Sequence, residues 1–343
     1  MACSDMCLDL IIVKEDGNMS TLLSIIIPIH DTNEQYLRAC LSVFIDYCDP
    51  RIEVILVDDG SDTSTCSVLK DAVHHFQCRF QVLHQKCMGP NAARHAGLQH
   101  ADGKYTYFID SDDALNWDAL QSVLKYLEAS SADVVLVGVE IAASNGTKQN
   151  LTYGDCVMRN CDARAIVSSA GPLWRQIQRT SMFVEYNIPL YDEIMLGEDM
   201  ASVVPILTHA KTIDSIPFLA YTHFNREHSI VGNMSVSRTK DILKAFDHLI
   251  AFGCFNDYFH ESIVALAIRH VLFFGITNIV MCEHFTRSDI LQFYRFMDTR
   301  FPDWEKCKFG NNDIKDKSSY RLIAKRHWLI FAILLRLRND LKK

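Results

Sequence analysis

The stretch RIEVILVDDGS, residues 51–61, decides the fold. Its short β-branched and aliphatic run indicates a buried strand that ends in Asp58, Asp59 and Gly60. A similar run, LLSIIIPIH, occupies residues 22–30. Because Pro28 cannot donate to a β-ladder, we expect this first strand to stop there.

Further strands are predicted at FQVLHQ (80–85) and YTYFID (105–110), and helical spacing of apolar residues alternates with these runs over 35–45, 64–76 and 91–99. This alternation predicts an α/β fold with a mostly parallel sheet. Ligands of such sheets bind outside the carboxyl ends of the strands. Asp58, Asp59, Asp110 and Asp112 are therefore expected to line one crevice.

The rest of the chain has a simpler pattern. It predicts a helix over 117–130, a strand over 133–143, a loop or hairpin over 144–163, a mixed region to 235, and helices from there on. The apolar run 263–282 contains charged and polar residues, so we expect a buried or interface-forming helix there and not a membrane span. Residues 1–18 are poorly patterned and are interpreted as an extension, or as preceding a natural start at Met19.

Composition narrows the class of protein. A chain of 343 residues, 49% hydrophobic, can form one large domain or one domain with an accessory region. The net charge of −8 argues against a partner nucleic acid. The 12 cysteines include no C-x-x-C pair, and acidic residues surround the apolar run 8–13 where a secretory signal would be basic, so we expect reduced thiols and a cytoplasmic protein.

The stretch FIDSDDALNWD, residues 108–118, crowds carboxylates behind a predicted strand. These side chains repel one another unless a divalent cation, which prefers oxygen ligands, lies between them. We expect Asp110 and Asp112 to bind such a cation. Capping of the next helix, or exposure to solvent, is expected for Asp113 and Asp118.

Five motifs together resemble the family-2 glycosyltransferases. In chain order they are SIIIPIHDTNEQYLRACLSV, EVILVDDGSDT, GPNAARHAGLQHADGKYTYFIDSDD, GEDM and YTHFNREHSI, and they span residues 24–230. The resemblance implies a GT-A fold, that is, a Rossmann-like mixed sheet flanked by helices, here with a helical C-terminal extension. It also implies inverting transfer of a sugar from a nucleotide-sugar, with UDP the expected nucleotide and Mn²⁺ or Mg²⁺ held by the D-x-D element. The expected organisation is an extension (1–20), a catalytic domain (21–239, with a nucleotide-sugar half to about 140 and an acceptor half from 141), and a helical region (240–343).

The resemblance assigns one set of residues to the donor. Those expected to bind the nucleotide-sugar are Pro28, Ile29, His30, Asp58, Asp59, Arg94, Asp110, Ser111, Arg226 and Ser229. Asp59 would accept an N–H of the base, whereas Asp58 could equally cap the next turn. Arg94 would face the donor, the alternative being a surface ion pair.

A second set concerns the metal and the reaction. The implied metal ligands are Asp112, Asp110 and His223, although a lone histidine is more often structural. Gly197 lets the backbone turn tightly before Glu198 and Asp199, which open a predicted helix and could simply stabilise its N-terminus. The resemblance makes Asp199, ahead of Glu198, the general base that takes the proton of the acceptor hydroxyl.

The C-terminal tail, residues 315–343, is positively charged, in contrast to the rest of the chain. Residues 315–343 carry nine Lys or Arg against two Asp, and 321–343 add an apolar run, Trp328 to Leu335. Eight apolar residues are too few to span a bilayer, which takes about 20. The tail favours peripheral contact with an anionic membrane surface over a final helix packed on the domain.

Three other interpretations compete with glycosyl transfer to a glycan, expected to be lipid-linked, in surface polysaccharide synthesis. A sugar nucleotidyltransferase would need a Gly-rich basic loop after the first strand, where this chain has PIHDTNEQYL. A non-catalytic sugar-nucleotide-binding scaffold would not need Asp112 and Asp199. A dehydrogenase is disfavoured because no G-x-G-x-x-G follows a strand. The helical region after 240 could also form a homo-oligomer.

Overall fold

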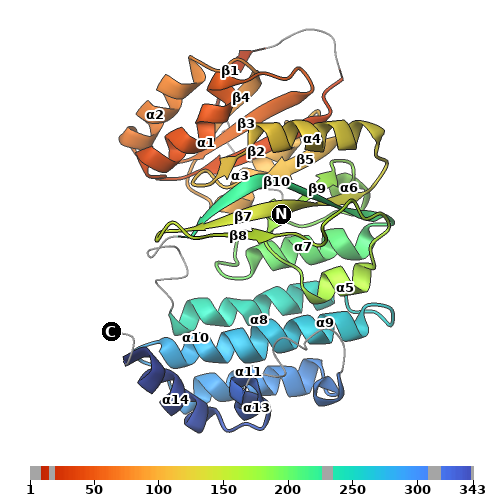
Figure 1. Ribbon diagram of the computed structural model, residues 1–343. Coiled ribbons are helices and arrows are strands. Elements are labelled where there is room, and N and C mark those ends of the chain that lie inside the picture. The colour runs from red at the N-terminus through yellow and green to blue at the C-terminus, as the bar shows by residue number, and fades with distance from the viewer. Residues whose placement is uncertain (1–8, 15–19, 226–234, 308–317, 341–343) are drawn as a thin grey trace. The chain divides into compact units, whose positions relative to one another are not determined.

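The computed structural model describes residues 9–14, 20–225, 235–307 and 318–340 (Figure 1). Its contacts divide the chain into two compact units. The first contains described residues of 1–161, 172–192 and 209–227, and the second those of 162–171, 193–208 and 228–343. The predicted boundaries at 20, 140 and 240 stay predictions.

The first unit is built on a ten-stranded mixed sheet with the order β1-β4-β3-β2-β5-β9-β7-β10-β6, in which β8 pairs with β7. The strands are β1 (Asp9–Lys14), β2 (Leu23–Ile29), β3 (Ile52–Asp59), β4 (Arg79–Gln85), β5 (Tyr105–Phe108), β6 (Ala114–Leu115), β7 (Val134–Ala143), β8 (Lys148–Leu151), β9 (Gln176–Arg179) and β10 (Ile213–Asn225). Strands β4, β3, β2 and β5 are parallel. The predicted α/β fold is therefore confirmed, with antiparallel strands added to a parallel centre.

Helices cover both faces of this parallel centre (Figure 1). They are α1 (Glu34–Asp46), α2 (Thr63–Val73), α3 (Pro90–Gln99) and α4 (Trp117–Ala129). The apolar faces of α1, α2 and α4 join one core cluster with Ile25 and Ile27 of β2. Gly97 of α3 lies against Ile26 and Val57, on the opposite face, because successive strand residues point to opposite sides. The sheet is thus buried on both sides, as the unbroken apolar runs require.

Two expectations about the strands were wrong. Residues 9–14, interpreted as part of an unpatterned extension, form β1, which pairs antiparallel with β4. Strand β2 does not stop at Pro28 but continues to Ile29, and Pro28 pairs with Val57 of β3. The ring costs no ladder bond because its nitrogen points to the side of β5, and pairing with β5 ends at Phe108.

The second unit is helical, as predicted for the residues after 235. Its helices are α5 (Ala163–Ser168), α7 (Glu198–His209, whose last residue belongs to the first unit), α8 (Val236–Ala251), α9 (His260–Ala267), the π-helix η3 (Ile268–Gly275), α10 (Ile276–Met281), α11 (Arg287–Arg300), α13 (Ser318–Ala324) and α14 (Trp328–Asp340). The continuous run His260–Met281 is the one described segment long and apolar enough to cross a membrane, and 67% of its most apolar window is buried inside the protein.

Candidate functional site

The candidate site of the first unit lies where its parallel strands end. Asp58 and Asp59 are the last residues of β3, His30 follows β2, and Asp110 comes two residues after β5. Since β3, β2 and β5 are neighbours in the sheet, their carboxyl ends open at one edge. The strand ends that were expected to lie together are thus neighbours in the sheet.

A tight turn follows β5 and gathers three carboxylates. The backbone N–H of Asp113 donates to the carbonyl of Asp110 across 3.2 Å, which closes the turn. One carboxylate oxygen from each of Asp110, Asp112 and Asp113 lies within 4.8 Å of the others. Three close anionic oxygens match the ligands that Mg²⁺ or Mn²⁺ requires, so these residues fit the cation implied by the sequence.

Asp113 has a role that the sequence did not reveal. Its side chain is 1% exposed and accepts hydrogen bonds from Tyr221 Oη (2.6 Å), His223 Nδ1 (2.8 Å) and the backbone N–H of Phe224 (2.9 Å). The expectation that Asp113 caps a helix or faces solvent was wrong, and Asn116 caps α4 instead. Asp113 fastens the turn to β10, leaving Asp110 and Asp112 at the more exposed side.

A stack of rings supports this anchor. The ring of Trp174 lies parallel to Tyr221 and His223, with centroids 4.9 and 5.1 Å apart. Burial opposes protonation of His223, but the hydrogen bond and charge of Asp113, together with the charge of Asp110, raise the pKa of His223. The predicted role of His223 as a metal ligand stays a prediction, since its Nδ1 is directed at Asp113.

Arg94 is buried and faces the turn. Its side chain is 5% exposed, and its Nη2 lies 2.9 Å from Asp110 Oδ1, while Nη1 donates to Asn91. Arg94 thus forms an ion pair whose guanidinium is buried, while its partner Asp110 is 33% exposed. Ser111 is buried and bonds Thr32 at 2.6 Å.

The two aspartates at the end of β3 have different hydrogen-bond partners. Asp58 accepts the backbone N–H of Ser61 at 3.0 Å, so it holds the next turn, and it contacts His84 Nδ1 at 2.6 Å. Burial raises the pKa of Asp58, but the hydrogen bonds from Ser61 and His84 outweigh it and the pKa is lowered. Asp59 is buried, and donors from the loop after β4 surround its carboxylate.

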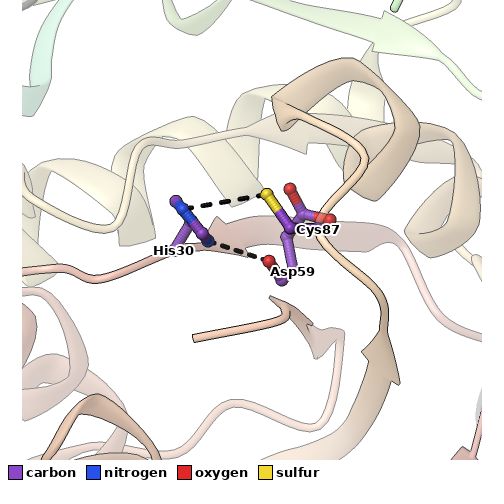
Figure 2. Close-up of side chains that lie close together, drawn as sticks. All are labelled: His30, Asp59 and Cys87. Carbon is purple, nitrogen blue, oxygen red and sulfur yellow. Dashed lines mark hydrogen bonds between the residues drawn. The ribbon is translucent and has the colours of Figure 1, made fainter. Parts of the chain in front are cut away.

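A third cluster at this edge was missed entirely (Figure 2). His30, Asp59 and Cys87 offer a nitrogen, an oxygen and a sulfur that lie within 4.8 Å of one another. His30 and Asp59 were predicted to bind the nucleoside, whereas Cys87, which follows β4, had no predicted role. The order of strands β4-β3-β2, which brings the three residues together, is the signal that could have found it.

The predicted general base lies in the second unit. Gly197 has φ +91°, a left-handed backbone that favours glycine, and α7 begins at Glu198 as expected. Asp199 and Glu198 occupy the first turn of α7 and are both partly exposed. Arg226 and Ser229, predicted to contact the donor phosphates, lie outside the described residues.

Comparison with known proteins agrees with this geometry. Residues 24–182 match the model of glycosyl transferase family 2. The chain is 22% identical over 263 residues to the poly(ribitol-phosphate) beta-N-acetylglucosaminyltransferase TarS of Staphylococcus aureus strain Mu50, covering 74% of this chain and 45% of that protein. It is 35% identical over 119 residues to the glycosyltransferase GlyG of Streptococcus pneumoniae, covering 34% of this chain and 39% of GlyG. The chain thus spans less than half the length of these relatives.

Solved structures carry the same fold. The crystal structure of S. aureus TarS 1–349 superposes with a TM-score of 0.68 at 15% identity, covering 93% of this chain and 92% of that one. The structure of TarS 1–349 in complex with UDP-GlcNAc gives the same TM-score at 16% identity. The fold is therefore GT-A with a helical C-terminal region, and residues 24–182 form a glycosyl transferase family 2 domain.

Proposed function

We propose that this protein transfers a sugar from a nucleotide-sugar, with UDP as the nucleotide, to a hydroxyl of a glycan. The observation that carries the proposal is the cluster Asp110, Asp112 and Asp113, held at the carboxyl edge of a GT-A sheet. Arg94 lies 2.9 Å from Asp110 of this turn, and Asp112 of the same turn is partly exposed. The solved TarS complex with UDP-GlcNAc supports the choice of donor.

Each residue at the strand ends would have its own role in binding the donor. Asp59 accepts an N–H of the base beside His30, and Asp110 binds the ribose. A divalent cation held by Asp110 and Asp112 would offset the charge of the diphosphate. Asp113 keeps the turn in place through Tyr221 and His223.

Asp199 would act as the general base. The acceptor oxygen forms a bond to the anomeric carbon while the bond from that carbon to the diphosphate oxygen breaks, and Asp199 takes the hydroxyl proton. One displacement from the face opposite the leaving group inverts the anomeric configuration. The N-terminus of α7 stabilises the ionised carboxylate that this role requires.

Nucleotide release tests the proposal without knowledge of the acceptor. The purified protein is incubated with UDP-, GDP- and dTDP-sugars, with and without Mn²⁺ or Mg²⁺, and slow hydrolysis is recorded. We expect metal-dependent release of UDP that is lost in Asp112→Ala and kept in Asp118→Ala, an exposed aspartate in the first turn of α4. A folded protein that neither binds nor hydrolyses any donor would contradict the proposal, and donor binding without turnover would favour the scaffold.

We further propose that α14 rests on an anionic membrane surface at the cytoplasmic side, near a lipid-linked acceptor. The ten cysteines of the described residues form no disulfide, as in a reducing compartment. Five large apolar side chains of α14 are more than half exposed: Leu329, Ile330, Ile333, Leu334 and Leu337. At about 100° per residue they share one arc of roughly 140°.

The charged residues beside this arc indicate which partner it contacts. By the same spacing Arg336 lies beside one border and Arg338 beside the other, while Phe331 and Ala332 point to the buried side. A second copy packed on the arc would bring arginines of like charge together, whereas anionic lipid head groups would pair with them. The helix has 13 residues, about 20 Å, so it can lie in the surface of a bilayer but cannot cross it.

A further inference from the structure

The cluster of His30, Asp59 and Cys87 lies at the ends of three adjacent parallel strands, β2, β3 and β4, and has a donor set unlike that of the acidic turn (Figure 2). Here one sulfur, one imidazole nitrogen and one carboxylate oxygen lie within 4.8 Å of one another. His30 and Cys87 are exposed, so the cluster is open to solvent, while Asp59 is buried beneath them. Such a mixed set does not suit Mg²⁺, which prefers oxygen alone.

The hydrogen bond of His30 fixes which of its nitrogens is available. Nδ1 lies 2.8 Å from the backbone carbonyl oxygen of Asp59. A carbonyl can only accept, so Nδ1 carries the hydrogen and the lone pair of the neutral ring is on Nε2. Nε2 faces Cys87 Sγ at 3.8 Å. Histidines that bind metals are oriented in this way, with the second nitrogen donating to a carbonyl or carboxylate.

The carboxylate of Asp59 accepts three hydrogen bonds and keeps one position for a ligand. Its Oδ1 accepts from Gln85 Nε2 (2.7 Å) and from the backbone N–H of Met88 (2.8 Å), and its Oδ2 accepts from the N–H of Gly89 (2.8 Å). An ionised carboxylate has about four lone-pair positions, so these three bonds leave one on Oδ2. Outer hydrogen bonds of this kind orient the ligands of metal sites.

Cys87 is held by a close backbone contact. Gly60 has φ +70°, and a Cβ there would lie 2.7 Å from the backbone nitrogen of Cys87, so the chain after β4 is seated directly on the turn after β3. Asp31 Oδ2, 3.8 Å from His30 Nε2, adds negative charge beside the cluster. The fold therefore brings the three candidate ligand atoms within 4.8 Å of one another.

We propose that His30 Nε2, Cys87 Sγ and Asp59 Oδ2 form a binding site for Zn²⁺, with a fourth position for water. Thiolate, imidazole and carboxylate are the usual protein ligands of zinc, and three of them leave a tetrahedral ion one open position. Binding replaces the hydrogen of the Cys87 thiol by the metal, and the proton passes to solvent. The site is distinct from the all-oxygen cluster at 110–113.

The inferred consequence is inhibition, and this part rests on the proposed function. The carboxylate of Asp59 is the group proposed to accept an N–H of the base, and His30 lies beside it. Zinc on Asp59 Oδ2 occupies the lone pair that the base would use. Zinc and donor nucleotide are then mutually exclusive at this edge of the sheet.

Cobalt reports the site directly, because Co²⁺ bound to a thiolate shows a sulfur-to-metal charge-transfer absorption that oxygen ligands do not give. The full-length protein is titrated with Co²⁺ and the ion is then displaced by Zn²⁺, with circular dichroism as a check on folding. We expect the absorption in the wild type and in Cys156→Ser, a control at another exposed cysteine, and its loss in Cys87→Ser. Zinc affinity should fall more than about tenfold in His30→Gln, as even outer partners of zinc ligands cost roughly 10–100-fold. A wild type without the absorption, or a Cys87→Ser variant that keeps it, overturns the site.

Competition is measured separately by calorimetric titration of UDP. Saturating Zn²⁺ should weaken UDP binding at least tenfold in the wild type and leave it unchanged in Cys87→Ser. Equal UDP affinity with and without Zn²⁺ overturns the overlap while the cobalt result upholds the metal site. Failure of UDP to bind under any condition contradicts the proposed function, whereas the cobalt titration decides the zinc site by itself.

Discussion

At the scale of single residues, the buried carboxylate of Asp113 explains how a crowded acidic turn keeps one conformation. Removing a charge from water is costly unless hydrogen bonds and opposite charge compensate it. Asp113 receives three donors from β10, about 110 residues later in the sequence. Repulsion within the turn is thus opposed by an anchor outside it, which holds the turn that carries Asp110 and Asp112.

The hydroxyl of Tyr221 should therefore be worth more than an ordinary tyrosine hydrogen bond. Tyr221→Phe removes a donor to a buried carboxylate and should lower the free energy of unfolding by about 1.5–3 kcal/mol. Tyr105→Phe is the matched control, because Tyr105 is equally buried and donates to the neutral carbonyl of Ser130, with an expected cost of about 0.5–1.5 kcal/mol. Urea denaturation of both variants gives the comparison, and equal losses would refute a charge-assisted anchor.

Substitutions of the two carboxylates at the start of α7 should have different effects on kcat. Asp199→Asn removes the proposed base but keeps a polar side chain in the first turn, so kcat for donor hydrolysis should fall about 10²–10⁴-fold with UDP affinity unchanged. Glu198→Gln should change kcat only a few-fold. Steady-state kinetics and calorimetry provide the two readouts. A mild Asp199→Asn beside a severe Glu198→Gln would transfer the role to Glu198.

The sequence predicted that Asp110 and Asp112 would be close, because both follow a recognisable strand and their spacing fixes the turn. It could not predict the burial of Asp113 or of Arg94, since that depends on side chains far away in the chain. Cys87 was overlooked for the same reason. Its partners lie on β2 and β3, and the order of the strands is a property of the tertiary fold.

At the scale of elements, the start of α11 combines two stabilising features that titrate together. Thr286 and Asp289 form a reciprocal capping box, and Lys240 Nζ of α8 lies 2.7 Å from Asp289. The hydrogen bonds from Lys240 and Thr286 lower the pKa of Asp289 from 3.8 to about 2. A lowered folded-state pKa stabilises the protein above the unfolded pKa, and that stability is lost as the pH falls through the folded pKa.

Asp289→Asn should accordingly lower the free energy of unfolding by about 1–2 kcal/mol at pH 7, and the loss should become smaller as the pH falls below 4. The substitution keeps the size of the side chain but removes its charge. Urea denaturation at pH 7, 4 and 3 measures the trend, with Asp247→Asn as a control at an exposed ion pair to Arg300. A cost that is independent of pH would show that the cap matters and the charge does not.

The apolar arc of α14 makes the proposed membrane contact testable. Ile333→Glu places a charge at the centre of the exposed arc and should reduce vesicle partitioning by about tenfold or more, since burying such a side chain is worth about 1.5–3 kcal/mol. Flotation with vesicles of phosphatidylcholine and phosphatidylglycerol measures it. Val184→Glu, at an 83% exposed position of α6 (Met182–Glu185), is the control and should bind as the wild type does.

Other results of the flotation experiment would contradict this contact. Equal binding to pure phosphatidylcholine would show that Arg336 and Arg338 do not select anionic lipid. A wild type that does not float but forms a dimer, which Ile333→Glu dissociates, would assign the arc to a second copy.

Strands and helices with a strong hydrophobic periodicity were predicted well, whereas short antiparallel strands were not. Strands β2 to β5 with α1 to α4 follow from alternating runs and helical spacing. Strand β9 has four residues, and it is placed by antiparallel pairing with β5 and β7, not by a pattern of its own. The π-helix η3 also gives no sequence signal distinct from that of an α-helix.

At the scale of the whole molecule, the chain forms its two units from interleaved segments. The second unit takes in residues 162–171 and 193–208, which lie between parts of the first unit in the sequence. Patterns read along the chain therefore predicted the helical character of the region after 235 but assigned α5 and α7 to the sheet domain. The predicted homo-oligomer stays a prediction.

The division into units predicts which segments should exchange their amide hydrogens more slowly when the donor nucleotide is bound. Binding to the folded state slows opening of the segments that contact the ligand, and at 100 times the dissociation constant it stabilises by about 2.7 kcal/mol. UDP with Mn²⁺ should slow hydrogen exchange in peptides covering 24–31, 53–62, 84–95 and 105–114, which carry the strand ends and the acidic turn. Peptides from α9 to α11 should exchange at their free rates. Asp112→Ala should remove the part of the protection that depends on Mn²⁺. Protection confined to α8 to α11 would place the nucleotide in the helical unit and contradict the assignment of Asp59 and the acidic turn to the donor.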